Sequence, residues 1–463
     1  MLLKNPEFIR NAWTELTPKK LIAMPLMLIT FFILAAMVTQ TVNFPVLSIL
    51  ALLFYSIFTF FWGTRLSAET VIKEINANTW SFQVMTSISP LKMALGKLFG
   101  STAYVWYGNI ICFALYGFSL YMYRDMLPGV DVSYALRNIL VFTLLGLCAH
   151  ILPLLMSLHS IRWRHFFERF NITFFQFGGL LMIIPLVYYL STDSLSTIYW
   201  FGGLFSLAEI TIMFSGIFIV WGMIAIVNQI KTEFGQEPYP VSWFLFALCV
   251  AVILFGFNDY RYVDVFRRYF GSMCALFSML AISYLTVCGE SNMALRPHMV
   301  LKYYKTKQYK RLFMIMPRTL TTIPIVIVLA GLLSYQFATM DAGSGTTMAY
   351  VVFALIFFML RDFCFIYLWS LFSQGHEKDT TAVPVMIALS TYTIIPAILH
   401  TASLKVFMPL FMPYFHSSPY FTFSESAVLT LAAPVLEFVL MFSLLCFGIR
   451  KKFKMLKAEG ALF

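Results

Sequence analysis

Charged residues are scarce in this sequence of 463 amino acids. Asp, Glu, Lys and Arg together make up only 11% of it, whereas 60% is hydrophobic. A soluble domain normally contains about 25% charged residues, and a water-exposed surface could not hide this much apolar material. The shortage excludes an ordinary soluble protein. It favours a chain that places its apolar surface in a lipid bilayer, where each helical crossing needs about 20 mostly apolar residues.

Three kinds of motif are missing as well. The cysteines form no Cys-x-x-Cys pair and lie within apolar runs or at their ends, so we predict neither a disulfide framework nor a metal site. No GxxxxGK[ST] nucleotide-binding loop occurs, because Gly96-Lys97 is followed by Leu98. The first apolar run begins at Leu21, behind a polar segment, and no small-residue cleavage site follows it. We therefore predict a membrane span there instead of a cleaved signal peptide.

Apolar segments long enough to cross a membrane recur along the whole chain. We predict an all-α polytopic membrane protein with about 12 spans, at residues 21–38, 45–62, 98–121, 136–158, 173–190, 205–227, 241–257, 271–287, 320–337, 349–370, 382–400 and 427–448. The stretch 228–240 resembles a linker and separates six spans from six. We assign residues 1–230, with an N-terminal interfacial helix, to a first half, and residues 231–463, with a basic cytoplasmic tail, to a second.

The basic residues give these spans an orientation. The net charge of +11 comes from Lys and Arg concentrated in alternate loops and at both ends of the chain. By the positive-inside rule this predicts that both termini are cytoplasmic, as an even number of spans requires. The exception is the outer loop 260–270, which contains Arg261, Arg267 and Arg268. The same pattern favours a cell membrane (a bacterial inner or plasma membrane) and lipid contacts, and it argues against nucleic acid as a partner.

The two predicted halves share a layout. In each, the longest cytoplasmic loop follows the second span, at 63–97 and 290–318, and an aromatic outer loop joins the fifth and sixth spans. We interpret this as duplication of a six-span unit. Coincidence is the alternative interpretation, because every polytopic protein alternates its loops.

The loop after the second span contains the most informative motifs. Apolar residues recur at helical spacing in two stripes: Ala68, Val71, Ile72 and Ile75, then Trp80, Val84 and Ile88, ending before Pro90. The pattern predicts an amphipathic helix lying at the inner membrane surface. Such a helix either anchors the neighbouring spans or serves as a docking site for a cytoplasmic motor.

Several short motifs in the first 120 or so residues occur in the order found in one family. They are the run from Asn5-Pro6-Glu7 to Pro25, then Glu69, Thr79-Trp80, Ser89-Pro90 and Gly96-Lys97. In these features the sequence resembles bacterial type-2 ABC exporter permeases. The resemblance implies that the loop docks on a separate ATPase, with the docking residues Glu69, Lys73, Thr79, Trp80, Ser89 and Pro90.

The resemblance has further implications. The partner would be an ABC ATPase, in two copies, and would bind ATP and Mg²⁺, so this chain would itself be no enzyme and hold no cofactor. Short re-entrant helices would lie in the aromatic outer loops, at 199–201 and 407–420. The family's six-span subunits normally dimerise, so this longer chain either holds both halves or, if they are not a fused pair, forms a homodimer. The second cytoplasmic loop lacks the Thr-Trp and Ser-Pro motifs, which leaves its docking role open.

Ionisable residues inside predicted spans are site candidates, because placing charge in a bilayer is costly. They are Glu209, Arg361, Asp362 and Glu437. They either line a polar substrate path or form structural ion pairs. His150, in the fourth span, is interpreted as a packing residue.

The expected function is a permease that moves a substrate by alternating access, driven by the separate ATPase. The alternative is an ion- or proton-coupled secondary transporter that uses Arg361 and Asp362 as coupling groups. A membrane enzyme for lipid-linked substrates is a third hypothesis, based on the grouping of His159, His165 and Glu168.

Overall fold

A computed structural model of the chain describes residues 4–38, 44–86, 88–123, 132–163, 171–192, 196–237, 239, 241–262, 264–289, 302–309, 311–312, 317–339, 344–372, 382–414 and 423–458. The chain forms two compact units. Unit 1 comprises Met1–Ile198 and Leu204–Tyr239, and unit 2 comprises Tyr199–Gly203 and Pro240–Phe463. The division falls after the predicted boundary at residue 230, because the helix α11 (Leu207–Glu233) continues through that position.

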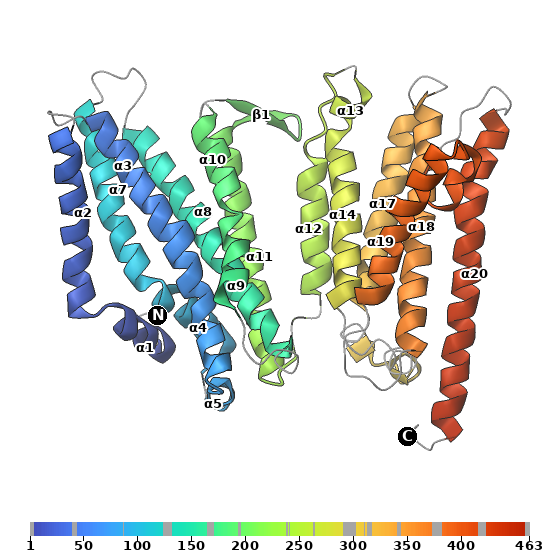
Figure 1. Cartoon of the computed structure of the whole chain (residues 1–463), viewed down its shortest axis with the longest axis horizontal. Helices are drawn as coiled ribbons and strands as arrows, with labels where there is room; N and C mark the ends of the chain where they lie inside the picture. Colours follow the sequence, from blue (N-terminus) through green and yellow to red (C-terminus); the bar gives the residue numbers. More distant parts are fainter. Residues whose placement is uncertain are drawn as a thin grey trace. The chain divides into compact units, whose positions relative to one another are not determined.

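Unit 1 consists almost entirely of helices (Figure 1). Its other elements are α1 (Pro6–Glu15), α2 (Pro18–Val38), α3 (Phe44–Ser56), the π-helix η2 (Ile57–Gly63), α4 (Thr64–Asn76), α5 (Trp80–Val84), α6 (Pro90–Ser101), α7 (Ala103–Tyr123), α8 (Val132–His159), the 3₁₀ helix η4 (Ser160–Trp163), α9 (Ile172–Leu180) and α10 (Ile183–Ser191). Two buried clusters form its core. One joins α2, α3, α7 and α8, and the other joins α4, α6, α8 and α11.

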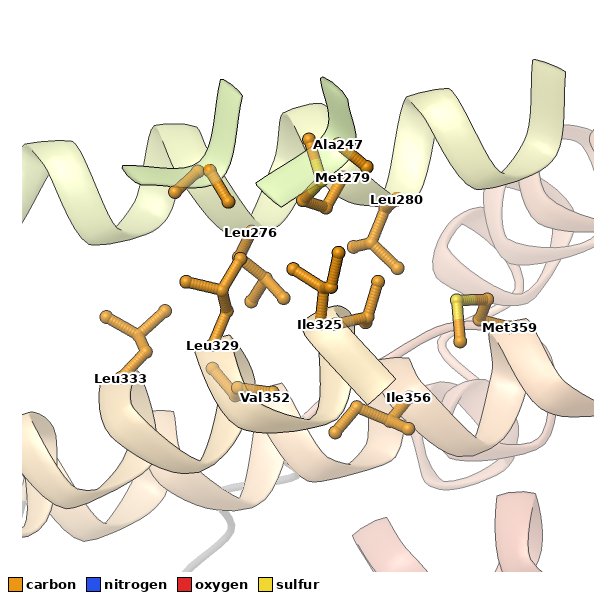
Figure 2. Packing of buried hydrophobic residues seen from close by; sticks show 14 of the residues in the cluster. Ala247, Leu276, Met279, Leu280, Ile325, Leu329, Leu333, Val352, Ile356 and Met359 are labelled. Atoms are coloured by element: carbon orange, nitrogen blue, oxygen red, sulfur yellow. The ribbon is translucent and has the colours of Figure 1, made fainter. Parts of the chain in front are cut away.

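Unit 2 has its own apolar core. Its elements are α12 (Ser242–Phe255), α13 (Val265–Arg268), α14 (Phe270–Gly289), α17 (Arg318–Ala338), α18 (Ser344–Phe372), α19 (Ala382–Thr401), the 3₁₀ helix η5 (Lys405–Leu410) and α20 (Phe423–Ala458). Figure 2 shows how Leu329 and Leu333 of α17 lie between Leu276 of α14 and Val352 of α18. These side chains recur about every four residues on α17, which aligns them along one helical face.

Among the described residues, nine helices are long and apolar enough to cross a membrane, or ten if the bent pair α1–α2 is one span. The protein is therefore a multi-pass, helical membrane protein. The helices α2, α12 and α19 overlap the remaining three predicted spans. The 14 residues of α12 extend only about 21 Å, which is less than the bilayer core of about 30 Å. The count of twelve and the cytoplasmic termini stay predictions.

One helix runs without interruption from Phe44 to Asn76 through α3, η2 and α4. Its 33 residues extend about 50 Å, well beyond the bilayer core. The face formed by Ala68, Val71 and Ile72 is completely buried, and α4 packs against α8 and α9. The predicted amphipathic helix at the membrane surface is thus wrong for residues 64–76. Its apolar stripe contacts protein, and the segment continues the second span.

The predicted outer loop between α10 and α11 also differs from its prediction. Instead of a re-entrant helix at 199–201, the strands β1 (Thr197–Trp200) and β2 (Gly203–Ser206) form a hairpin. Phe201 (φ 45°) and Gly202 (φ 81°) between them both adopt left-handed backbone angles, as a two-residue type I′ turn requires. In the second outer loop the six-residue helix η5 covers Lys405–Leu410, whereas residues 415–420 lie outside the described part of the chain.

Candidate functional site

The short helix α5 lies beyond the far end of the long helix α3–η2–α4 (Figure 1). Asn78, in the left-handed conformation at φ 57°, turns the chain between α4 and α5, a backbone region that Asn tolerates well. On α5 and its C-terminal end, Trp80 and Gln83 are buried, while Phe82 is 69% exposed and Met85 is 82% exposed. The predicted docking residue Trp80 therefore faces the protein, and the sequence prediction missed the two exposed apolar residues beside it.

The predicted docking residues Glu69 and Lys73 form a local pair on α4. Lys73 Nζ lies 2.6 Å from Glu69 Oε2, and Arg65 Nε lies 2.9 Å from Glu69 Oε1. Both basic side chains are largely exposed, whereas the carboxylate is mostly covered. The three residues follow one another at four-residue spacing, so α4 presents two cations along one face.

The remaining docking candidates shape the chain on either side of α5. The Thr79 hydroxyl donates a hydrogen bond to the Glu74 carbonyl at 3.3 Å. Ser89 occupies the N-cap position of α6 and Pro90 its first turn, where a fixed φ and a missing N–H are favourable. Their roles are thus to end one helix and to begin the next.

A charge network around the buried Lys97, which we call the Lys97 network (Glu7, Arg10, Glu74, Gln83 and Lys97), ties α5 to the rest of unit 1, with the half-exposed Arg10 at its edge. The completely buried Lys97 Nζ lies 2.7 Å from Glu74 Oε2 and 3.2 Å from Glu7 Oε1. Arg10 Nη2 lies 2.6 Å from Glu74 Oε1 and 2.8 Å from Glu7 Oε1, and Gln83 Nε2 donates to Glu74 Oε1. Two cations balance two carboxylates, which is the condition under which buried charges are tolerated.

The Lys97 network connects four helices. Glu7 and Arg10 belong to α1, Glu74 to α4, Gln83 to α5 and Lys97 to α6. The Lys97 ammonium also lies 5.4 Å from the centre of the Trp80 ring, a favourable cation–π arrangement. The network therefore holds α5 against α1, α4 and α6.

Two glycines allow α1 to approach α6 closely. A Cβ at Gly96 would lie 2.7 Å from Glu7 Cβ and 2.8 Å from the Phe8 nitrogen, and one at Gly100 would lie 3.0 Å from the Phe8 oxygen. The four-residue spacing places both glycines on one face, as in other close helix–helix contacts. Any larger residue at Gly96 would push α1 away from the buried charges.

A second network in unit 2, the Arg361 network, contains three of the predicted intramembrane charges. Arg361 of α18 pairs with Glu437 of α20 and, at 2.9 Å, with the neighbouring Asp362. Asp362 Oδ2 also accepts hydrogen bonds from the hydroxyls of Tyr284 at 2.7 Å and Tyr392 at 2.6 Å. The residues come from α14, α18, α19 and α20. One guanidinium faces two carboxylates, so the ionised network has an excess of one negative charge.

The fourth predicted intramembrane charge, Glu209, has a different role. Its carboxylate accepts a hydrogen bond from the Ser206 backbone N–H at 2.8 Å, and its own N–H donates to the Ser206 hydroxyl. This reciprocal capping box satisfies backbone donors at the start of α11. Glu209 is therefore a helix cap, and its surroundings differ from those of Glu437.

A sequence signal for the Lys97 network existed. Lys97 interrupts an apolar run between Gly96 and Leu98, and charged residues at such positions need a partner. Glu7 and Glu74 are not adjacent to it in sequence, so only the fold identifies them as its partners. The hypothesis of a membrane enzyme depended on a grouping of His159, His165 and Glu168. Two of these residues, His165 and Glu168, lie outside the part of the chain that the structure describes.

Within the described ranges, no group of three or more His, Cys, Asp or Glu side chains could hold a metal ion. No protein-family model matches this chain, and no curated protein or solved structure matches it. A functional assignment therefore depends on the membrane architecture and on the two networks.

Proposed function

We propose that this chain is the membrane-spanning permease of an ATP-driven exporter, and that α5 docks on a separate ATPase. One observation supports this above all: Phe82 and Met85 are exposed at the end of a helix that is too long for the bilayer. Three residues apart, they form a compact apolar patch that a partner could cover. Arg65 and Lys73 on α4 would add electrostatic attraction to an acidic rim.

The connections of α5 suit a part that transmits force. The continuous helix α3–η2–α4 links it to the second span, and the Lys97 network links it to α6, which leads directly into α7. A displacement of α5 by the partner would thus move two spans together, because packed helices connected by buried ion pairs shift as rigid bodies. ATP and Mg²⁺ would bind to the partner.

Site-specific photo-crosslinking tests this proposal in native membranes. A photoreactive phenylalanine analogue at Phe82 or Met85 should form a crosslink to an ATP-binding-cassette ATPase, identified by mass spectrometry. The matched control is Phe177 on α9, which is 63% exposed on an apolar span and should crosslink to lipid. Absence of an ATPase from the adducts at both α5 positions would refute the docking role.

A second function, ion- or proton-coupled transport, is favoured by the excess carboxylate of the Arg361 network. A proton or a cation would neutralise it, and intramembrane carboxylates often mark such pathways. Proteoliposomes that contain only this chain provide the test. Proton entry down an imposed pH gradient, lost in Glu437→Gln, would favour the secondary transporter, whereas proton entry that is unchanged in Glu437→Gln would exclude Glu437 as its coupling group.

A further inference from the structure

Of the six buried side-chain polar atoms in the described part of unit 1 that have no hydrogen-bond partner, three belong to residues near the π-helix η2. They are Trp106 Nε1, Asn109 Oδ1 and His150 Nδ1. Asn109 and His150 are completely buried. Buried polar atoms are nearly always paired with protein or water, so three atoms in one region that have no partner in the protein call for a partner from outside it.

All three residues gather around the π-helix η2. His150 Nε2 lies 3.2 Å from the Thr59 carbonyl oxygen, which can only accept, so the ring proton is on Nε2 and Nδ1 presents a lone pair. Asn109 Nδ2 donates to the Thr59 hydroxyl at 2.9 Å, which leaves the amide oxygen as an acceptor. The Trp106 ring meets the His150 ring edge to face at 5.5 Å. Because Asn109 follows Trp106 by three positions on α7, both lie on one face of that helix.

The backbone is adapted to this arrangement. A Cβ at Gly63, the last residue of η2, would lie 2.1 Å from His150 Nε2, so only glycine leaves space for the imidazole. Single π-helical turns inside α-helices frequently occur at functional sites. Here the π-helix and Gly63 together admit a polar ring into an otherwise apolar span.

We propose that Trp106, Asn109 and His150 form an internal binding site for one neutral hydroxyl group. The set offers two acceptors and one N–H donor. A water molecule within reach of all three atoms would donate to His150 Nδ1 and Asn109 Oδ1 and accept from Trp106 Nε1, and buried waters typically make about three such bonds. An alcohol satisfies the donor and one acceptor and places its carbon chain among the apolar residues of this core. Neither source depends on the proposed exporter function.

X-ray radiolytic footprinting of the purified chain tests the site, because hydroxyl radicals formed from a bound water oxidise the side chains next to it. We expect the Trp106 indole to be oxidised, while Cys112, which lies six residues further along α7 and is 1% exposed in an apolar cluster, stays unmodified. In H₂¹⁸O the new oxygen on Trp106 should carry the heavy isotope. An unmodified Trp106, or equal oxidation of Cys112 by penetrating bulk water, would overturn the proposal.

Substitutions and an added alcohol sharpen the result. Asn109→Leu should abolish Trp106 oxidation. Asn138→Leu is the matched control, because Asn138 is a buried amide whose two ends pair with Tyr116 and Tyr189, and it should leave Trp106 oxidation unchanged. Oxidation that persists in folded Asn109→Leu refutes the site. Because 1-butanol also scavenges hydroxyl radicals in bulk solution, its effect on wild-type Trp106 is compared with its effect on Trp13, which is 79% exposed. A larger decrease at Trp106 identifies a site that accepts an alcohol, and an equal decrease identifies one that holds water alone. Where Asn109→Leu fails to fold, His150→Phe, which removes the other acceptor, provides the same comparison, because Trp106 is only partly buried and the wild type alone does not decide.

Discussion

The ammonium group of Lys97 lies 2.7 Å from a carboxylate oxygen of Glu74, and the whole lysine side chain is buried. The two residues belong to α6 and α4, on opposite sides of the short helix α5 in the sequence. Their contact closes the chain around α5 and determines which of its side chains face outward. The exposure of Phe82 and Met85 is therefore a consequence of this ion pair and of the burial of Trp80 and Gln83.

Replacement of this lysine should destabilise unit 1. In Lys97→Met, Glu7 and Glu74 lose a cation from a buried site, and breaking such a pair costs about 3–5 kcal/mol. Lys73→Met is the matched control, since Lys73 is 66% exposed and surface pairs contribute about 0–1 kcal/mol. Thermal unfolding in detergent should show a large decrease in midpoint for Lys97→Met and almost none for Lys73→Met. Equal midpoints for both variants would contradict the buried network.

Glycine substitutions should separate α1 from α6. Gly96→Ala introduces a methyl group into the space occupied by Glu7 and the Phe8 backbone, so α1 should detach and expose Lys97. An alanine normally stabilises a helix by about 1 kcal/mol relative to glycine. A lower stability of Gly96→Ala than of the wild type would therefore be due to the clash with α1 and not to helix propensity. Gly117→Ala on α7 is the control, because nothing lies within 4 Å of its added Cβ. Increased hydrogen exchange across residues 6–15 in Gly96→Ala, and no increase in Gly117→Ala, is the expected outcome.

The membrane character of the protein follows from its sequence because it depends on local hydrophobicity, which each span displays independently. The pairing of charges could not be predicted in the same way. Arg361 and Asp362 are adjacent and suggested a pair, but Tyr284 and Tyr392 reach the network from other helices. The apolar stripe from Ala68 to Ile75 correctly predicted a helix. It did not predict that this helix packs against α8 and α9 instead of the membrane surface, because the same periodicity suits contact with lipid or with protein.

The turn after α12 should respond to acid. Asp259 accepts hydrogen bonds from Arg261, which hold the pKa of the Asp259 carboxyl below its usual value of 3.8. A carboxyl with a lowered pKa stabilises the fold above its unfolded pKa and loses that contribution as the pH falls through its folded pKa. Hydrogen exchange at residues 258–262, corrected for its intrinsic pH dependence, should stay constant near neutrality and increase only below the usual aspartate range. Asp259→Asn should remove this transition. A transition near neutral pH would contradict the pairing.

The two carboxylates of the Arg361 network should differ in importance. Asp362 is 3% exposed and accepts bonds from Arg361, Tyr284 and Tyr392, so Asp362→Asn puts an amide group where an acceptor is needed and leaves buried donors unsatisfied, at a cost of about 1–3 kcal/mol for each. Glu437→Gln retains a hydrogen-bond acceptor for Arg361 and removes the excess negative charge, so unit 2 should remain as stable or become more stable. Thermal unfolding of the two variants measures the difference. If Glu437→Gln lost as much stability as Asp362→Asn, both carboxylates would be structural partners of Arg361, and the excess charge would not be available for a proton or a cation.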